Sequence, residues 1–169
     1  MFLVKPSTHY ENQYMDFYND WKSSEEEMVP FVIKKEPINF QSMLDYLLDC
    51  EKGIEPPENW IPENSTYWLI DNQEVIGVVN IRHYLTKPLF NAGGHIGYGI
   101  RPSKRNNGYA TQILSLALEK ARDLNLDKVL LVCHSTNTAS KKIILKNGGE
   151  MDNDYNDGEN ILNRFWIYC

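Results

Sequence analysis

A strand, a basic turn, a long helix and a second strand follow one another between residues 95 and 134, and this succession constrains the fold more than any other part of the sequence. "HIGYGIRP" at 95–102 predicts a strand. "GYATQILSLALEKARDLNL" at 108–126 predicts a helix, because apolar residues recur every three or four positions. "KVLLVCH" at 128–134 is a continuous apolar run, typical of a strand buried on both faces. This order of elements predicts an α/β protein.

The other predicted elements lie on either side of this unit. Before it we expect a short strand at 2–6 and a helix at 8–23 capped by Thr8. A second helix at 39–52 begins at Asn39 and ends at Gly53, and an irregular segment follows at 54–65. "STYWLID" and "EVIGVVNIRHYL" flank "DNQE" and predict a hairpin. After the unit we expect a short helix at 137–149 capped by Asn137, a polar turn at 152–160 and a last strand at 161–169. The whole chain, residues 1–169, is thus expected to form one domain around a mixed α/β sheet.

The composition excludes several classes of function. The formal net charge of −6 argues against nucleic acid as a partner, because binding to the many phosphates of a nucleic acid backbone requires an excess of positive charge. No apolar run approaches the ~20 residues of a membrane span, and the first residues do not resemble a signal peptide. The three cysteines are far apart and form no metal-binding pattern. We therefore expect a cytoplasmic protein with no metal, no nucleic acid partner and no membrane partner.

The basic turn "RPSKRNNGYATQ" at 101–112 is a candidate anion site. The amide N–H groups at the start of a helix have no partner within the helix, and the helix dipole adds partial positive charge there. Gly108 has no Cβ, so a bulky anion could approach the backbone, and Arg101, Lys104 and Arg105 add charge. These features together predict a cradle for a diphosphate. An ordinary solvated loop, or a site for another phosphate ligand such as a nucleotide, remains the alternative.

Two motifs around this turn resemble a known family. "RNNGYA" at 105–110 is similar to the R/Q-x-x-G-x-G/A signature of the GNAT superfamily of acetyl-CoA-dependent N-acetyltransferases. "NTASKKIILKNGG" at 137–149 resembles the next motif of that family. The resemblance implies a mostly antiparallel sheet with one splayed parallel strand pair and about four helices. It also implies an acetyl-CoA-binding core at residues 94–150 and an N-terminal part that shapes the acceptor side.

The resemblance also implies roles for individual residues. The diphosphate of acetyl-CoA would bind to the turn, with Arg101 adding charge and Thr111 a hydroxyl group; the turn residues are Arg105, Asn106, Asn107, Gly108, Tyr109 and Ala110. The pantetheine arm would lie between the splayed strands, beside Asn137 and Ser140. The backbone N–H of Ile100 would hydrogen-bond the thioester carbonyl oxygen. The glycine-bearing strand would be bulged where the thioester approaches.

The implied reaction is direct attack of an amine on the thioester carbonyl. The family often places a tyrosine on the helix after Ser140 to protonate the leaving thiolate, and the corresponding position here is Ile144. His95, Tyr98 and His134 are the candidates for handling protons, although each could equally have a purely structural role. His95 and Tyr98 are expected on opposite faces of their strand. Cys133 lies in an apolar run that disfavours its thiolate, so a covalent mechanism is not expected.

Two functions therefore compete at the level of the sequence. The first is an N-acetyltransferase that acts on a primary amine of a small molecule or peptide. The second is a weakly active or inactive module that binds acyl-CoA or acts as a sensor of it, and the isoleucine at position 144 favours this alternative. Acidic runs at 25–27 and 152–159 could attract a cationic amine, although solvated loops of this kind are more common. The acceptor stays unidentified, and analogy with the family allows a homodimer.

Overall fold

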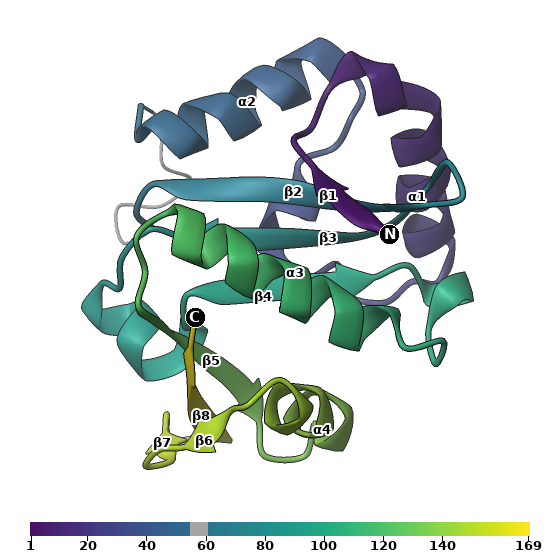
Figure 1. Cartoon of the computed structure of the whole chain (residues 1–169). Helices are drawn as coiled ribbons and strands as arrows, with labels where there is room; N and C mark the ends of the chain where they lie inside the picture. The colour runs from purple at the N-terminus through teal and green to yellow at the C-terminus, as the bar shows by residue number, and fades with distance from the viewer. Residues whose placement is uncertain (55–60) are drawn as a thin grey trace.

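The computed structural model describes residues 1–54 and 61–169, which form two β-sheets flanked by helices (Figure 1). The first sheet has the order β1 (Phe2–Val4), β2 (Asn64–Asp71), β3 (Glu74–Arg82) and β4 (Ile96–Ile100), with every neighbouring pair antiparallel. The second sheet contains β5 (Lys128–His134), β8 (Ile161–Tyr168) and β6 (Glu150–Met151), and β7 (Tyr155–Asn156) also pairs with β8. The predicted irregular segment includes residues 55–60, which lie outside the described residues.

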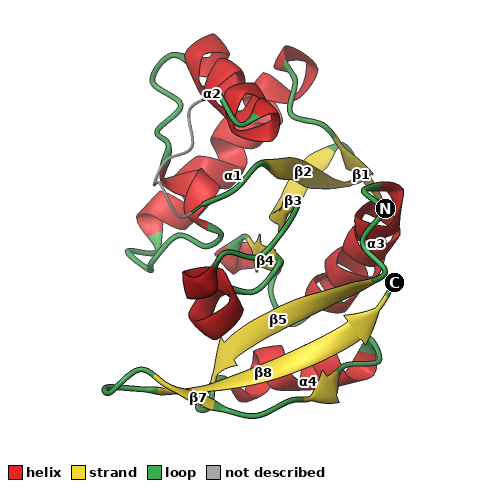
Figure 2. Ribbon diagram, turned by 90° about the vertical axis from the view of Figure 1, so that its left-hand side faces the viewer, coloured by secondary structure: helices red, strands yellow, loops and turns green. Residues whose placement is uncertain are grey.

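Four α-helices cover the sheets in the described part of the chain: α1 (Glu11–Ser23), α2 (Phe40–Lys52), α3 (Tyr109–Asp123) and α4 (Thr138–Lys146). Helices α1 and α2 lie on one face of the first sheet and α3 lies on the other face (Figure 2). Each face has its own apolar core. The core on the α1 and α2 side contains Phe17, Trp21 and Trp68, and the core on the α3 side joins both sheets through residues such as Leu131 and Phe165.

Strands β4 and β5 are hydrogen-bonded to each other beside His95. Its backbone N–H donates to the carbonyl oxygen of Leu130 at 2.7 Å, and its side-chain Nδ1 accepts from the Leu130 N–H at 2.8 Å. Beyond this contact, β4 and β5 belong to different sheets. The expected splayed strand pair is therefore present, and the gap that it opens is available to a ligand.

Short-range sequence signals placed most element boundaries correctly. The side chain of Asn39 accepts from the Ser42 N–H and begins α2, and Gly53 ends that helix with a φ of 69°. Asn137 caps α4 in the same way, by accepting from the Ser140 N–H. The β2–β3 hairpin turns through residues 72 and 73, both with positive φ as a two-residue hairpin turn requires.

Three local expectations were wrong. Thr8 does not cap α1, because residues 8–10 form a separate 3₁₀ turn and the helix begins at Glu11. The turn predicted at 152–160 contains the short strand β7, and β6 was not predicted at all. Strand β4 is not bulged, since its pairing with β3 continues without a shift in register.

The glycines of β4 accommodate the protein's own chain. A Cβ atom at Gly99 would lie 2.0 Å from the carbonyl oxygen of Val29 and 2.4 Å from Cη2 of Trp21. Both positions are far below van der Waals contact, so only glycine lets the segment after α1 cross this strand. The group that approaches Gly99 most closely is thus the backbone of Val29.

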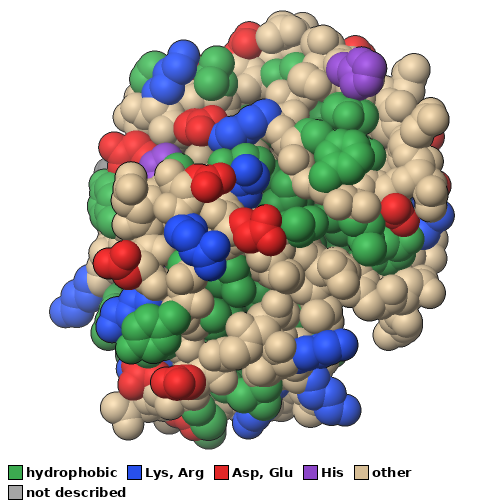
Figure 3. Space-filling model, viewed as in Figure 1, with side chains coloured by type: hydrophobic (Ala, Val, Ile, Leu, Met, Phe, Trp, Pro, Cys, Tyr) green, Lys and Arg blue, Asp and Glu red, His purple; other side chains and the backbone are tan. Residues whose placement is uncertain are grey.

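The surface carries charges of both signs. On the face shown in Figure 3, Asp and Glu side chains are interspersed with Lys and Arg. Within residues 1–54 and 61–169, no helix has the length and apolar character needed to cross a membrane. The same residues contain no group of three His, Cys, Asp or Glu side chains that could hold a metal ion.

Candidate functional site

The turn before α3 presents a row of free backbone amides. Gly108 occupies the N-cap position with a φ of 81°, and a Cβ there would meet nothing within 4 Å. In the described part of the chain, the N–H groups of residues 106–110 have no hydrogen-bond acceptor. Next to them is a cavity of about 440 Å³, which Asn106, Gly108, Tyr109, Ala110 and Thr111 line from the turn and the first turn of α3. A row of free amides beside a cavity is the arrangement that binding of an anion at a helix N-terminus requires.

The three cations of this turn are each engaged with a carboxylate. Nε of Arg101 donates to Asp20 on α1 at 2.8 Å, and Nζ of Lys104 lies 2.6 Å from a carboxylate oxygen of Glu74 on β3. Arg105 forms an ion pair with Glu26, and its Nε donates to the carbonyl oxygen of Ile100 at 3.2 Å. These cations therefore hold the turn against α1 and the hairpin.

Two predicted site residues turn away from the cavity. Arg101 does not line it, because its side chain extends to Asp20 and to the backbone carbonyl of Asp16 on the outer face of α1. The side-chain amide of Asn107 donates to the carbonyl oxygens of Lys104 and Arg105 and stabilises the turn from outside. The backbone of Asn107 still contributes its N–H to the row of free amides.

Lys142 is a cation of the cavity that the sequence analysis missed. It lies on α4, is exposed, and lines the same cavity as Gly108 and Thr111. No ion pair of Lys142 is found among the described residues, in contrast to Lys104 and Arg105. The sequence of α4 does not show which of its side chains reach the cavity. That depends on how α4 packs beside α3.

The edge of β4 that faces the gap carries free N–H groups. The Arg82 N–H donates to the His95 carbonyl and the Arg101 N–H donates to the Ile76 carbonyl, so odd-numbered residues of this strand pair with β3. Hydrogen bonds alternate along an antiparallel strand, and the N–H groups of Tyr98 and Ile100 therefore point away from β3. They are oriented to bind an extended ligand as a neighbouring strand would.

A second cavity continues from the first into the gap between β4 and β5. It has a volume of about 340 Å³ and shares Val29, Tyr98 and Ser140 with the cavity at the turn. Cys133 and His134 line it from the end of β5. The two cavities thus adjoin, and together, named the cleft here, they extend from the amide-lined turn to the end of β5.

Residues of α4 close one wall of this cleft. Ser140 lines both cavities, and Asn137 and Ile144 line the inner one. The Asn137 oxygen is used to cap the helix, which leaves its amide NH₂ group free for a ligand. Ile144 is buried in the core, with 1% of its surface exposed, so the position where the family often has a tyrosine is apolar here.

Tyr98 stands where the two cavities meet. Its hydroxyl group is buried beside the side chain of Ser140, and it forms no hydrogen bond of normal geometry in the described part of the chain. Burial raises the pKa of Tyr98 above its ordinary value, so the hydroxyl keeps its proton at neutral pH. A protonated hydroxyl without a hydrogen bond, on a residue that lines both cavities, is suited to donate to a bound ligand.

The two histidines occupy different environments. His95 lines neither cavity and is held by Leu130, while burial and the charge of Arg82 lower its pKa to about 4. His134 is exposed at the end of β5 and lines the inner cavity. His134 also contributes to the lowered pKa of Glu27, which is due mainly to Lys34, and it therefore lies near that carboxylate.

The segment at residues 29–31 forms a wall that the sequence analysis missed. Val29, Pro30 and Phe31 line the inner cavity opposite α4, and Trp21 lines the outer one. The sequence around residues 29–31 has no pattern that indicates contact with the glycines of β4. Their place in the site follows from the crossing over Gly99.

The combination of fold and site defines a class of protein. A mixed α/β fold, split between two strands and closed at one end by an amide-lined turn, is built to hold an extended acyl-CoA beside an opening for an acceptor. A family model described as an acetyltransferase (GNAT) domain matches residues 3–150. The chain therefore belongs to the GNAT acetyltransferase family and is an enzyme of the acetyl-CoA-dependent N-acyltransferase class.

Solved structures share this fold at low sequence identity. The ribosomal-protein-S5-alanine acetyltransferase from Vibrio fischeri is 13% identical, with a TM-score of 0.70 over 98% of this chain and 91% of that one. A spermidine N-acetyltransferase from Vibrio cholerae is 15% identical, with a TM-score of 0.65 over 99% and 95% of the two chains. The microcin C7 self-immunity acetyltransferase, solved with acetyl-CoA and AMP, is 14% identical, with a TM-score of 0.67 over 99% and 91%. No curated protein sequence matches the chain.

Proposed function

We propose that the protein transfers the acetyl group of acetyl-CoA to a primary amine of a small molecule or peptide. The amine nitrogen attacks the thioester carbonyl carbon directly, a C–N bond forms, the C–S bond breaks, and CoA leaves as a thiolate. The observation that carries the proposal is the continuous cleft from the free amides of residues 106–110 to the gap between β4 and β5. Its two ends match the two ends of the donor substrate, a diphosphate and a thioester.

The donor is held mainly by backbone groups in this proposal. The diphosphate binds to the free amides around Gly108, and Lys142 supplies an unpaired positive charge. The pantetheine arm lies along the free edge of β4, with Asn137 and Ser140 on the opposite wall. The Ile100 N–H is the donor to the thioester oxygen, where negative charge develops during attack. We assign Arg101 to its ion pair with Asp20.

Tyr98 is proposed as a hydrogen-bond donor to the reacting thioester. Its hydroxyl lies where the cleft narrows between β4 and α4. Because its pKa is raised, transfer of its proton to a thiolate of pKa about 8.5 is unfavourable, whereas donation of a hydrogen bond is favoured. This role would replace part of the function of the tyrosine that is absent at position 144.

His134 is proposed as the group that accepts a proton from the attacking amine. It lines the inner cavity and is exposed to solvent, to which it can pass the proton. Glu27 and Asp157 lie near it, since His134 makes a small contribution to the lowered pKa of each carboxyl group.

His95 and Cys133 are assigned no catalytic role. The imidazole of His95 is neutral at physiological pH and its Nδ1 is occupied by the Leu130 N–H, which makes it a link between the sheets. Burial raises the pKa of the Cys133 thiol. A protonated thiol is a poor nucleophile, which favours direct attack over an acetyl-cysteine intermediate.

A thiol-release assay tests the proposed activity. The protein is incubated with acetyl-CoA and a panel of amines, and free CoA is measured with a chromogenic disulfide. We expect turnover with at least one amine. A thermal shift with acetyl-CoA but no turnover with any amine would instead support a binding module, and a shift with a nucleotide but not with acetyl-CoA would contradict both functions.

Two substitutions test the proposed proton-handling residues. Tyr98→Phe and His134→Phe should each lower kcat/KM at least ~10-fold, since general acid–base and oxyanion contacts are worth roughly 10²-fold or more. The exposed residues Tyr84 and His9 provide controls as Tyr84→Phe and His9→Phe. If kcat/KM stays within about threefold of the wild-type value, the assigned role is wrong.

A further inference from the structure

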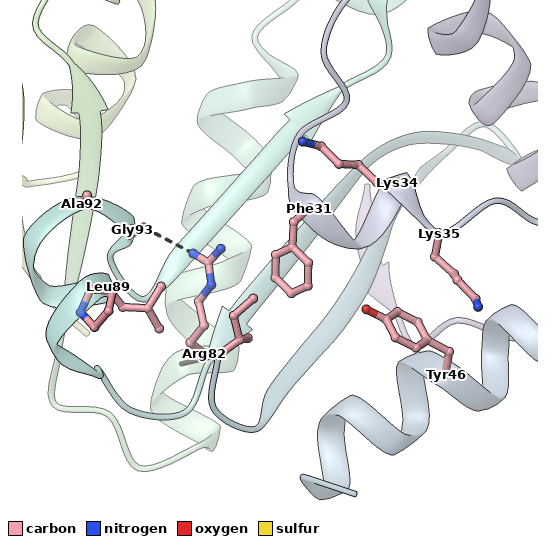
Figure 4. Close-up of a pocket in the computed structure, with 10 residues that line it drawn as sticks. Phe31, Lys34, Lys35, Tyr46, Arg82, Leu89, Ala92 and Gly93 are labelled. Atoms are coloured by element: carbon pink, nitrogen blue, oxygen red, sulfur yellow. Dashed lines mark hydrogen bonds between the residues drawn. The ribbon is translucent and has the colours of Figure 1, made fainter. Parts of the chain in front are cut away.

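A third cavity lies beyond the inner end of the cleft and has a volume of about 720 Å³ (Figure 4). Phe31, Arg82, Ala92 and Gly93 line both this cavity and the inner part of the cleft. The two spaces therefore adjoin at these four residues. If the proposed function is correct, this third cavity is where the acceptor binds.

Arg82 is placed at the junction without a carboxylate partner. Its side chain emerges from the end of β3 beside the ring of Phe31, with the guanidinium carbon 5.6 Å from the ring centre (Figure 4). Only 9% of the residue's surface is exposed. Its Nη1 makes two long hydrogen bonds of 3.3 Å, to the carbonyl oxygens of Gly93 and Gly94, and its Nε has no partner among the described residues.

The other buried or half-buried arginines of the protein are neutralised. Arg101, Arg105 and Arg164 each form an ion pair with an aspartate or glutamate. No carboxylate in residues 1–54 or 61–169 pairs with Arg82. Burial lowers the pKa of Arg82 to about 10, so the guanidinium remains charged at neutral pH. A buried charge without a counterion is destabilising, and an anionic ligand at this position would remove that cost.

The rest of the third cavity adds positive and apolar groups. Lys34 and Lys35 lie at its rim, and Lys35 has no ion pair among the described residues, its Nζ lying 5.1 Å from the ring centre of Tyr46. Phe31, Tyr46 and Leu89 supply apolar surface (Figure 4). No carboxylate lines this cavity in the described part of the chain. A second cationic group on the acceptor would therefore be repelled here.

The acidic runs of the sequence do not change this polarity. Glu26 and Glu27 pair with Arg105 and Lys34. Asp152 pairs with Arg164, and the carboxylate of Asp157 accepts backbone N–H groups of its own turn. The expectation that these runs attract a cationic amine thus has little support from their contacts.

We propose that the acceptor is a small amine that carries a carboxylate, and that Arg82 binds this carboxylate through its unused N–H groups. A planar guanidinium can bind a carboxylate with two parallel hydrogen bonds. A Cβ built at Gly97 would lie 3.5 Å from both Nη1 and Nη2 of Arg82, and Gly97 directly precedes Tyr98. Successive side chains of a strand point to opposite faces, and the inner cavity, which both Arg82 and Tyr98 line, is what connects the anion site with the proposed reaction centre. A small acceptor that carries both an amine and a carboxylate, such as an amino acid, would bind with its carboxylate on Arg82 and its apolar part beside Phe31 and Tyr46.

Matched pairs of acceptors test this proposal. Amino acids with apolar or aromatic side chains are compared with their carboxamides, which have the same amine and side chain but no negative charge. We expect kcat/KM for the acids to exceed that for the amides by at least ~10-fold, the worth of one charged hydrogen-bonded contact. The amide amine is the less basic of the two and so is more available as the free base, which biases the comparison against the proposal. Equal rates, or a preference for the amides or for spermidine, would overturn it.

Substitution of Arg82 separates recognition from folding and from catalysis. Arg82→Met keeps the length and apolar packing of the stem, and Arg82→Lys keeps the charge but not the paired geometry. We expect Arg82→Met to lose at least ~10-fold more kcat/KM on the acid than on the matched amide, with Arg82→Lys intermediate. An equal loss on both acceptors would contradict a role in binding the carboxylate.

Binding measurements distinguish this inference from the proposed function itself. The thermal shift caused by acetyl-CoA reports the donor site and should survive in Arg82→Met, which also shows that the variant is folded. Calorimetric titration of N-acetylated amino acids, the expected products, into the CoA-loaded protein reports the carboxylate site without any turnover. Binding that is lost in Arg82→Met supports the anion site even if no acceptor is turned over. Absence of product binding to the wild type, together with turnover of uncharged amines, would refute the anion site and leave the acetyltransferase intact.

Discussion

His95 should make the stability of the protein depend on pH in a defined window. Burial and the charge of Arg82 lower its pKa from 6.5 to about 4. Between these two values the unfolded chain binds more protons than the native protein does. Stability that is present above pH 6.5 is therefore lost as the pH falls through this window.

The size of the effect follows from the shift. Each pKa unit corresponds to about 1.4 kcal/mol, so the complete contribution is about 3 kcal/mol. Roughly 2 kcal/mol of it should be lost between pH 7 and pH 5, where most carboxylates remain ionised. Because the His95 residue is only 7% exposed, little correction for solvent screening is needed.

Urea denaturation at the two pH values measures this loss. The His95→Asn variant removes the titrating group and keeps an oxygen near the position of Nδ1 to accept the Leu130 N–H. We expect the wild type to lose roughly 2 kcal/mol more than this variant between pH 7 and pH 5. His9→Asn, at an exposed histidine, should behave like the wild type. The reasoning is refuted if His95→Asn shows the full wild-type pH dependence, or if the His95 resonance titrates near pH 6.5 by NMR.

Three further predictions address packing and the donor site. Gly99→Ala should lower the free energy of unfolding by about 1–3 kcal/mol in chemical denaturation, because the new methyl group is overpacked against the Val29 carbonyl. Gly97→Ala, whose nearest contact would be 3.3 Å, should lower it less, and equal losses of unfolding free energy would contradict the close crossing. Lys142→Ala should raise the KM for acetyl-CoA about 5–10-fold with little change in kcat, and the difference from wild type should shrink at high salt, because the lost contact is an exposed charge. Saturating acetyl-CoA should slow alkylation of Cys133, which lines the cleft, but not alkylation of Cys169. Mass spectrometry of labelled peptides measures both rates, and equal protection of the two thiols would place the donor elsewhere.

The sequence by itself determined the features that depend on neighbouring residues. The caps at Asn39 and Asn137 and the turn at Gly108 were predicted because each depends on a few consecutive residues. The apolar periodicity of α3 and the continuous apolar run of β5 predicted a strand–helix–strand order, which is the order found in the family. Thr8 failed as a cap because the chain forms a 3₁₀ turn before α1, and the sequence offers no local signal that separates the two.

The tertiary structure alone decided the chemistry of the cleft and of the cavity beside it. The turn cations Arg101 and Arg105 were expected to attract phosphate, yet each is paired with a carboxylate of the segment 16–27, some 80 positions away in sequence. Arg82 ends an ordinary-looking strand, and only the packing of residues 29–31 and 92–94 around it buries its charge. A residue's charge can be read from the sequence, but whether that charge is neutralised depends on which distant groups the fold brings within a few ångströms. This is why the donor was predictable and the polarity of the third cavity was not.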